Sequence, residues 1–326
     1  MGADIGDLVE GRDVALDDLD GAVALDAYNA IYGFLANIRQ RDGTPLQDSR
    51  GRVTSHLSGL LYRTANLYEA GVHPVYVFDG PPPDLKSETV ERRRERKQEA
   101  LESYEEAARK GDEAEMLKHA QRATSLDQPQ VETSVALLEA LRVPWMEAPS
   151  EGEAQAAYMC REGDVDYAGS QDYDSLLFGA PALARNLTIR GRKGSDLTPE
   201  VVELESVLDG LGLTREQLIE VAVLVGTDYN DGVHGVGPKT AVDVVLDGEV
   251  RERLREGDPD ADLDAIKRLY MEPEVTDDYS LEWEPPDADA VEALLCDEHD
   301  FSVDRVRKAV ERIESATTQS SLDRWS

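Results

Sequence analysis

Short apolar runs alternate with segments of helical periodicity over the first 225 residues. Residues 23–26 and 75–79 each read as a strand that ends in an aspartate. The segment 55–70 has helical periodicity and is followed by Gly71, a residue suited to closing a helix. Further elements of the same alternation are a helix over 131–141, a strand over 143–146 and a helix over 154–160. Strands that alternate with helices predict an α/β fold, with a central, mostly parallel sheet flanked by helices.

The remaining segments have a different pattern. Residues 84–125 are highly charged and almost free of proline, which predicts a helical hairpin broken at 110–112. From Leu213 onward the pattern is mostly helical, with helices over 214–225 and 238–246. The last eight residues are polar and short of apolar spacing, so we expect a free tail.

Charge is the most unusual feature of the composition. The 326 residues include 68 Asp and Glu against 34 Lys and Arg, a formal net charge of −34, and 26 of the 34 basic residues are arginine. An acidic excess with few lysines is typical of proteins adapted to concentrated salt, where carboxylates stay hydrated and their repulsion is screened. The 40% hydrophobic share is sufficient for a core, which argues against a disordered chain. Taken alone, the charge also argues against a polyanionic partner.

No segment reads as a signal or membrane span. The first thirty residues lack a basic start followed by an apolar stretch, and the longest aliphatic run, residues 221–225, is far shorter than a bilayer crossing. Cys160 and Cys296 lie in apolar, helix-like settings and read as buried thiols rather than a disulfide framework. We therefore expect a soluble intracellular protein, in the cytoplasm and without a membrane partner.

Carboxylates gather where predicted strands end. Asp26, Asp79 and Asp172 follow three such strands, and ligands of open α/β sheets bind beyond the carboxyl ends of the strands. The pairs Glu151/Glu153 and Asp172/Asp174 have a spacing of two, which places both side chains on one face of an extended stretch. An all-oxygen cluster of this kind suits Mg²⁺ or Mn²⁺. The alternative is ordinary: Asp26, Asp172 or Asp174 would cap a helix, and any one acid of 68 would be a solvated surface charge.

A glycine-rich loop separates the last two predicted helices. Gly235-Val236-Gly237 precedes Pro238, a residue favoured at the first position of a helix, and Lys239 adds charge in the same turn. Backbone N–H groups at such a helix start can hold a phosphate without contacting a base. The alternative is a helical hairpin with a purely structural purpose.

Taken together, these motifs resemble the flap endonucleases, the structure-specific 5′ nucleases of the XPG family, in their archaeal–eukaryotic form. The order and spacing of the matching strings cover essentially the whole chain. The strings are residues 25–27 with Tyr32, residues 54–57, 76–80, 149–156, 171–174 and 226–229, followed by the glycine loop.

The resemblance implies a nuclease centre with two divalent cations, Mg²⁺ or alternatively Mn²⁺. Lys86 and Arg93 match basic residues that neutralise the reacting phosphate. Seven acids match the metal ligands of the family: Asp26, Asp79, Glu151, Glu153, Asp172, Asp174 and Asp228.

The resemblance also implies contacts with branched DNA. Tyr32 matches an aromatic residue that stacks on a base at the bend of the DNA, and Arg39 and Arg63 fall where members touch the template strand. The loop at Gly235, Gly237 and Lys239 matches the helix–two-turn–helix element, which binds the downstream duplex and commonly a K⁺ ion.

The implied organisation is a nuclease core over 1–318 and a short tail over 319–326. The core divides into an N-terminal region over 1–99, a helical gateway and cap over 84–125, a catalytic region over 140–226 and the DNA-binding helices over 227–318. The basic run 92–97 lies within the cap and answers the objection raised by the net charge, although such a run can also be a solvated helix face. In the tail, Gln319, Leu322 and Trp325 resemble the peptide that docks on the sliding clamp PCNA, although Ser326 stands where a second aromatic is usual.

We therefore expect a monomeric, Mg²⁺-dependent 5′-flap endonuclease that also has 5′–3′ exonuclease activity. Its expected roles are Okazaki-fragment maturation and long-patch repair. Three alternatives remain at this point: a related 5′ exonuclease or gap nuclease, a PIN-type ribonuclease, and a DNA-junction binding module with an inactive centre.

Overall fold

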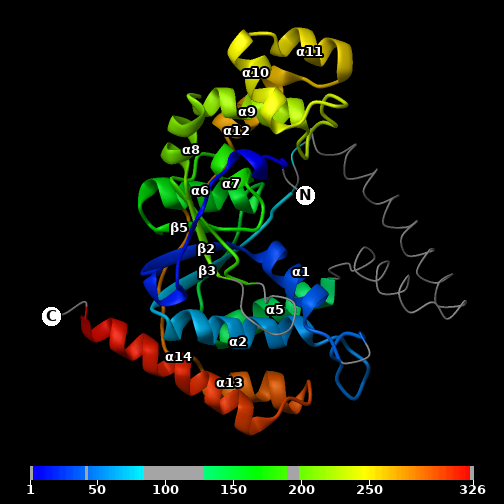
Figure 1. Ribbon diagram of the computed structural model, residues 1–326. Coiled ribbons are helices and arrows are strands. Elements are labelled where there is room, and N and C mark those ends of the chain that lie inside the picture. The colour runs from blue at the N-terminus through cyan, green and yellow to red at the C-terminus, as the bar shows by residue number, and fades with distance from the viewer. Residues whose placement is uncertain (1–2, 41–42, 82, 84–127, 189–197, 324–326) are drawn as a thin grey trace, which may run out of the picture.

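A seven-stranded mixed sheet forms the centre of the molecule (Figure 1). The computed structural model describes residues 3–40, 43–81, 83, 128–188 and 198–323. The strand order is β1-β7-β6-β5-β2-β3-β4, in which β2 to β6 pair in parallel and β7 is antiparallel to both β6 and β1. The strands are β1 (Arg12–Asp13), β2 (Gly21–Asp26), β3 (Val72–Phe78), β4 (Trp145–Glu147), β5 (Tyr167–Gly169), β6 (Ala182–Arg185) and β7 (Glu200–Glu203). The predicted α/β fold with a mostly parallel sheet is confirmed.

Helices cover both faces of this sheet, as the alternation of strand residues requires. On β2, Val23 and Leu25 face a core shared with α1, α2, α5 and α14, whereas Ala24 faces a core shared with α6, α7 and α9. The first set of helices is α1 (Ala27–Asn37), α2 (Ser55–Glu69), α5 (Gln128–Ala140) and α14 (Val303–Asp323). The second set is α6 (Gly152–Glu162), α7 (Asp174–Leu177), α8 (Leu204–Leu211) and α9 (Arg215–Val225). Helix α14 packs on α2, and thereby forms an outer layer on that side of the sheet.

Local capping signals set several helix boundaries. Helix α2 ends at Glu69, and Gly71 follows with φ +82°, a left-handed conformation that favours glycine. Helix α9 begins after Thr214, whose hydroxyl accepts from Gln217 N while the Gln217 side chain accepts from Thr214 N. Both boundaries were predicted from the sequence within one residue.

The order of the strands reverses at β2. The chain passes from β2 to β3 and β4 on one side, then returns to place β5 and β6 on the other side of β2. The carboxyl ends of β5, β2 and β3 therefore lie side by side where the strand order reverses, the usual ligand position in open α/β sheets.

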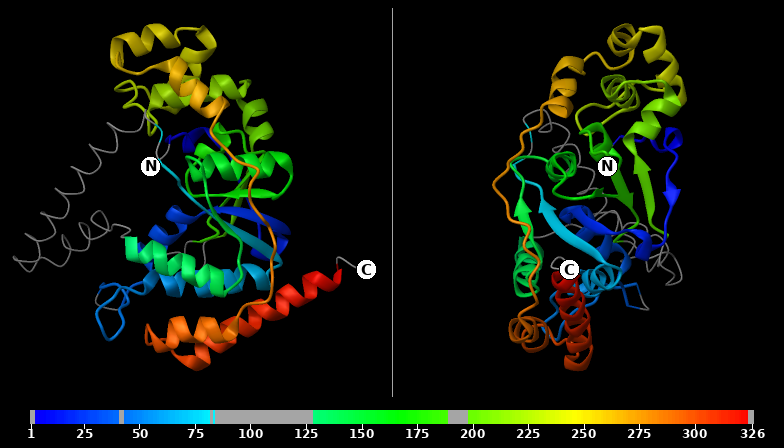
Figure 2. Two further views of the ribbon diagram at one scale, coloured as in Figure 1. Left: turned by 180° about the vertical axis from the view of Figure 1, so that it is seen from behind. Right: turned by 90° about the vertical axis from the view of Figure 1, so that its left-hand side faces the viewer.

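An extended strap over residues 272–287 connects the two ends of the molecule. One end carries α10 (Pro238–Asp247), α11 (Val250–Gly257) and α12 (Leu263–Met271). The other carries α13 (Ala288–Glu292), the π-helical turn Ala293–Asp297 and α14. Figure 2 shows the strap running between them along one edge of the molecule. Gln155 exchanges two side-chain hydrogen bonds of 2.9 Å with the main chain of Thr276, and Trp283 Nε1 donates to Pro74 O at 2.8 Å.

Two predictions about the termini and thiols need correction. Helix α14 continues to Asp323, where the sequence predicted a free tail from residue 319, because no Pro or Gly stops a helix anchored by buried residues such as Val310 and Ile313. Cys160 is buried, but Cys296 is half-buried. In the described ranges, no helix is long and apolar enough to cross a bilayer. The helical hairpin predicted over 84–125 lies outside the described residues, and the predicted division into regions stays a prediction.

Candidate active site

Two aspartates lie at the ends of neighbouring parallel strands. Asp26 is the last residue of β2, and its Oδ1 accepts from Asn29 N at 2.9 Å, so it also caps α1. Asp79 follows the last residue of β3, and its Oδ1 accepts from Gly152 N at 2.7 Å. Asp26 pairs with Val77 in the sheet register, so both carboxylates arise at the same edge. Asp26 therefore caps helix α1 and also lies at the candidate site.

Two glutamates enter this edge at the start of α6. Glu151 precedes the helix and is 9% exposed, and Glu153 lies in its first turn. Glu153 Oε1 accepts from Ser170 Oγ at 2.7 Å, and Ser170 directly follows β5. This hydrogen bond ties the start of α6 to the end of the neighbouring strand.

The pair Asp172 and Asp174 follows β5. The strand ends at Gly169, so Asp172 comes three residues after it rather than at its end. Asp172 Oδ2 lies 3.4 Å from Asn29 Nδ2, and Asp174 Oδ1 accepts from Ala3 N at 2.8 Å. Asp174 is the first residue of α7 and does not cap it. The alternative that Asp174 serves as the N-cap of a helix is therefore wrong.

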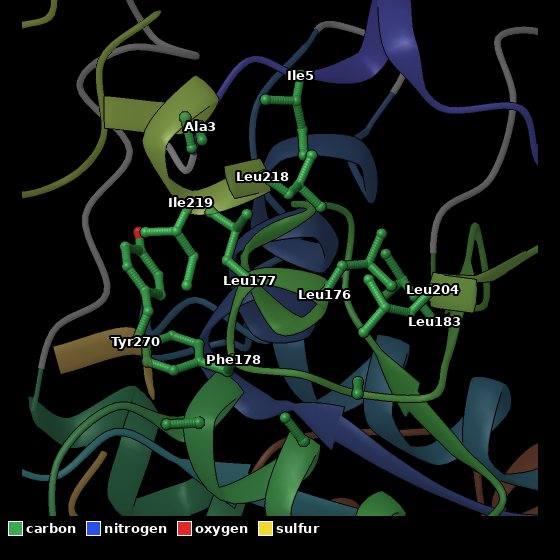
Figure 3. Close-up of a cluster of buried hydrophobic side chains, with 14 of the residues drawn as sticks. Ala3, Ile5, Leu176, Leu177, Phe178, Leu183, Leu204, Leu218, Ile219 and Tyr270 are labelled. Atoms are coloured by element: carbon green, nitrogen blue, oxygen red, sulfur yellow. The ribbon is translucent and has the colours of Figure 1, made fainter. Parts of the chain in front are cut away.

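Helix α7 is held rigidly behind these acids. Figure 3 shows Leu176, Leu177 and Phe178 packed among residues of α9 and α12. The ring of Phe178 lies 4.7 Å from that of Tyr270 (centroid to centroid). Because the helix cannot shift without disturbing this core, the position of Asp174 is fixed from behind.

Asp228, the last of the seven acids, follows helix α9. It is 8% exposed and lies in the turn after α9, where Thr227 Oγ1 donates to Asn230 Oδ1 at 2.9 Å. The charge of Asp228 is one of the causes, after burial, that raise the pKa of Asp174. The predicted seventh acid therefore belongs to the group.

The pKa shifts link five of these acids: Asp26, Glu153, Asp172, Asp174 and Asp228. Burial, followed by the charges of Asp174, Asp26 and Asp172, raises the pKa of Glu153 well above its usual value. Burial raises the pKa of Asp174 to about 7, and the charges of Asp228 and Asp172 add to this against the lowering effect of Ala3 N. At neutral pH the cluster retains protons unless cations neutralise it.

The donor chemistry of the cluster fits a hard divalent cation. All seven side chains offer carboxylate oxygens, the ligands that Mg²⁺ and Mn²⁺ prefer. Asp79, Glu153 and Asp174 each accept a hydrogen bond that fixes one oxygen, an arrangement common among ligating carboxylates. Among the described residues, no three His, Cys, Asp or Glu side chains stand in an arrangement that could already hold an ion. The individual ligand roles stay predictions.

The glycine loop before α10 presents an open helix start. Gly235 has φ +81°, and Gly237 is the residue before the helix, with Pro238 at its first position. A Cβ added at Gly235 or Gly237 would meet no atom within 4 Å, so the backbone faces open space. Lys239 is exposed in the first turn. This geometry suits the approach of a phosphate to backbone N–H groups.

The predicted DNA-contact residues of the sheet region differ in exposure. Tyr32 on α1 is 41% exposed. Arg39 is half-buried, and its guanidinium donates to Ala36 O at 2.8 Å and Gly43 O at 3.0 Å. Arg63 is 7% exposed, and its guanidinium donates to the carbonyls of Asn186 and Leu187. Arg63 is therefore buried and bound to the main chain of residues 186–187, which the sequence did not predict.

Several predicted residues cannot be placed. Lys86, Arg93 and Trp325 lie outside the described residues. Gln319 and Leu322 lie within α14, but their side chains are not described.

Supporting residues that were not predicted from the sequence include Ala3, Asn29, Gly152 and Ser170. Each hydrogen-bonds a carboxylate of the cluster or positions one. A signal for Gly152 exists in the string Glu151-Gly152-Glu153, because a glycine between two acids suggests a close approach. Ser170 and Asn29 have no comparable signal.

Comparisons with known proteins agree on one family. The XPG N-terminal domain matches residues 8–100, and the XPG I-region matches residues 142–228. Flap endonuclease 1 of Methanosarcina acetivorans is 50% identical over 100% of both chains. The structure of flap endonuclease-1 from Methanococcus jannaschii superimposes with a TM-score of 0.80 at 42% identity, covering 98% of this chain and 100% of that one. The catalytic core of Rad2, solved in complex with a DNA substrate, superimposes with a TM-score of 0.73 at 25% identity, covering 96% and 100%. The chain thus belongs to the flap endonucleases, structure-specific DNA nucleases whose family roles are in replication and repair.

Proposed function

We propose that this nuclease hydrolyses a phosphodiester near the junction of a 5′ flap, with two divalent cations held by the seven carboxylates. Two observations support the proposal. Asp26 and Asp79 follow neighbouring parallel strands at one sheet edge, and the charges of Asp26, Asp172, Asp174 and Asp228 raise the pKa of Glu153 or of Asp174. Mg²⁺ is the cation we expect, with Mn²⁺ as an alternative. When bound, the cations would activate water, polarise the scissile phosphate and stabilise the leaving oxygen.

The chain's own residues would prepare this centre before DNA arrives. Gly152 N, Ser170 Oγ and Ala3 N each fix one carboxylate oxygen. Pre-set ligands avoid the cost of ordering flexible acids at the moment of reaction. Lys86 and Arg93, both outside the described residues, would neutralise charge on the reacting phosphate.

Recognition of branched DNA would depend on shape and stacking more than on net charge. Exposed Tyr32 would stack on a base where the DNA bends, a contact that tolerates any sequence. The backbone at Gly235 and Gly237, with Lys239, would hold the downstream duplex, and a K⁺ ion in that loop is part of the proposal. Arg39 remains a proposed template-strand contact, whereas the burial of Arg63 favours support of residues 186–187 instead.

Cleavage of one labelled double-flap substrate tests the proposal. We expect the purified protein to cut near the junction with Mg²⁺ and to lose activity with a chelator. Asp172→Ala should reduce cleavage to background, while Asp209→Asn, an exposed acid on α8, should not. Cleavage by Asp172→Ala at the wild-type rate would overturn the proposal.

Substrate comparison separates the remaining activities. Blunt, nicked and gapped duplexes measure the 5′–3′ exonuclease relative to flap cleavage, and an all-RNA flap measures ribonuclease activity. A preference for RNA over DNA flaps would contradict the proposed substrate.

The sliding clamp PCNA is the proposed protein partner, and the enzyme is expected to act as a monomer. Gln319, Leu322 and Trp325 would form the docking segment. Removing residues 319–326 should abolish clamp binding in a pull-down and leave flap cleavage without the clamp unchanged. Clamp binding by the truncated chain would place the contact elsewhere.

A further inference from the structure

Arg185, at the end of β6, grips the segment that carries two of the cluster acids. Its Nε and Nη2 donate to the Gln171 carbonyl at 3.2 and 3.1 Å. Its Nη1 donates to the Tyr173 hydroxyl, and its guanidinium carbon lies 4.2 Å from the centroid of the Tyr173 ring. Gln171 and Tyr173 are the two residues that flank Asp172. One side chain therefore holds both neighbours of a predicted ligand.

The arginine is itself held in place. Its Nη1 donates to Glu200 Oε2 at 2.7 Å, and the two residues are directly paired across the antiparallel strands β6 and β7. The side chains of Arg185 and Glu200 are 20% and 22% exposed, so water screens the pair less than a surface ion pair. A planar guanidinium can donate to three partners and stack on a ring at once, which a lysine cannot do.

The N-terminal segment closes over this arrangement. A Cβ at Gly6 would lie 3.3 Å from Tyr173 Cε2, and a Cβ at Gly11 would lie 2.2 Å from Glu200 Oε1. The chain therefore packs directly against both the tyrosine ring and the glutamate. Such close packing leaves residues 171–173 little room to move.

We propose that Arg185 is a positioning residue for the metal centre, which fixes the direction of Asp172 and Asp174 through Gln171 and Tyr173. This rests on the proposed metal-ligand role of the two acids. Asp172 itself has two further contacts: its main-chain N donates to Ser170 Oγ at 3.1 Å, and its Oδ2 accepts from Asn29 Nδ2 at 3.4 Å. Arg185 adds to these by holding the residues on both sides of Asp172. Loosening the segment would leave the acids present but poorly directed.

Mn²⁺ affinity, measured without DNA, distinguishes this role from a purely structural one. The variants are Arg185→Gln and Arg185→Lys, with free Mn²⁺ followed by electron paramagnetic resonance. We expect both to raise the Kd for Mn²⁺ by about 10- to 100-fold, the usual effect of losing a residue that orients ligands. The matched control is Arg307→Gln on α14. Arg307 is another paired arginine, whose guanidinium donates to the carboxylate of Glu292 at 2.6 and 2.9 Å. The control should bind Mn²⁺ like the wild type.

Thermal unfolding and Asp174→Asn complete the experiment. Asp174→Asn should weaken Mn²⁺ binding; if it does not, the proposed metal centre itself is wrong. If Asp174→Asn weakens binding while Arg185→Lys and Arg185→Gln stay within twofold of the wild type, only the positioning role is overturned. The positioning role would also be overturned if Arg307→Gln lost Mn²⁺ affinity as the Arg185 variants do, with the loss in each variant proportional to the fall in its Tm. Should Arg185→Gln fail to fold, Arg185→Lys decides alone.

Discussion

The main-chain N–H of Gly152 lies 2.7 Å from Asp79 Oδ1, and a Cβ at Gly152 would lie 2.9 Å from the same oxygen. The glycine therefore both donates to the carboxylate and makes room for it. Val77 O, 3.2 Å from that Cβ position, closes the space on another side. This contact explains why a glycine separates Glu151 from Glu153.

Gly152→Ala should displace Asp79 and weaken metal binding and flap cleavage together. The added methyl cannot be accommodated because backbone as well as a carboxylate surrounds it. We expect a fall in cleavage of about 10- to 100-fold at limiting Mg²⁺, measured as initial rates across a Mg²⁺ series.

Gly210→Ala is the matched control. Gly210 lies in α8, and a Cβ there would meet no atom within 4 Å. This variant should cleave normally and gain about 0.4–1 kcal/mol in free energy of unfolding. Equal cleavage by Gly152→Ala and Gly210→Ala would contradict the proposed tight fit.

His56 should make the fold sensitive to mild acid. It is 1% exposed, its Nε2 lies 2.9 Å from Thr133 Oγ1, and its Nδ1 has no partner within the described residues. Burial, with the charge of His299 adding to it, lowers the pKa of His56 to about 4. Its pKa in the unfolded chain is about 6.5, so the unfolded state takes up a proton first as pH falls. The stabilising effect is complete above about pH 6.5 and is lost as pH falls toward 4.

Denaturant unfolding between pH 5 and 7 tests this. The free energy of unfolding should fall by up to about 1.4 kcal/mol per pH unit below pH 6.5, and His56→Gln should flatten the slope. His234→Gln, at an exposed position, should leave the slope unchanged. Parallel slopes for the wild type and His56→Gln would show that His56 does not titrate as expected.

Lys239→Gln should weaken duplex binding at all sequences alike. A lysine at a helix start contacts phosphate, so its loss should reduce the slope of log Kd against log salt by about 0.9. Fluorescence anisotropy with a labelled duplex over a KCl series measures both quantities. Lys308→Gln, exposed on α14, serves as the control. An unchanged slope for Lys239→Gln would remove this residue from the interface.

Activity should persist or rise in molar KCl. A protein with about 6–10 phosphate contacts loses about 10³–10⁵ in DNA affinity between 50 and 200 mM salt. Stacking, helix-start hydrogen bonds and bridging cations are less affected by screening, and they dominate the proposed interface. Cleavage rates across KCl at fixed Mg²⁺ measure this, and a steep fall above ~0.2 M would contradict it.

The strand-end acids and the main helices were predictable because periodicity and capping are local signals. Residues 23–26 and 75–79 are apolar runs whose burial on both faces leaves little choice of structure. Strands β1, β6 and β7 were missed because pairing with neighbouring strands, rather than a local pattern, defines them. Residues 319–323 were expected to be a free tail because they are polar, but helix α14 continues through them to Asp323.

The sequence placed Asp26 and Asp79 at strand ends, as the structure has them, but not the residues that support the acids. Topology alone brings Asp26, Asp79 and Asp172 to one edge. The contacts of Ala3 with Asp174 and of Arg185 with Tyr173 join residues far apart in the chain, and no local pattern announces them.

The strap over residues 272–287 is a segment at which proteolysis would cut the chain between the two ends of the molecule. It carries no helix or strand, and side-chain contacts such as Gln155–Thr276 and Trp283–Pro74 hold it to the body of the protein. A protease that cut it would sever the covalent link between the α10–α12 end and the α13–α14 end, while the first stayed packed on α9 and the second on α2 and α5. Limited digestion would then yield two fragments that stay together on a gel-filtration column and separate only in denaturant, a nicked enzyme with its two ends no longer tied to each other.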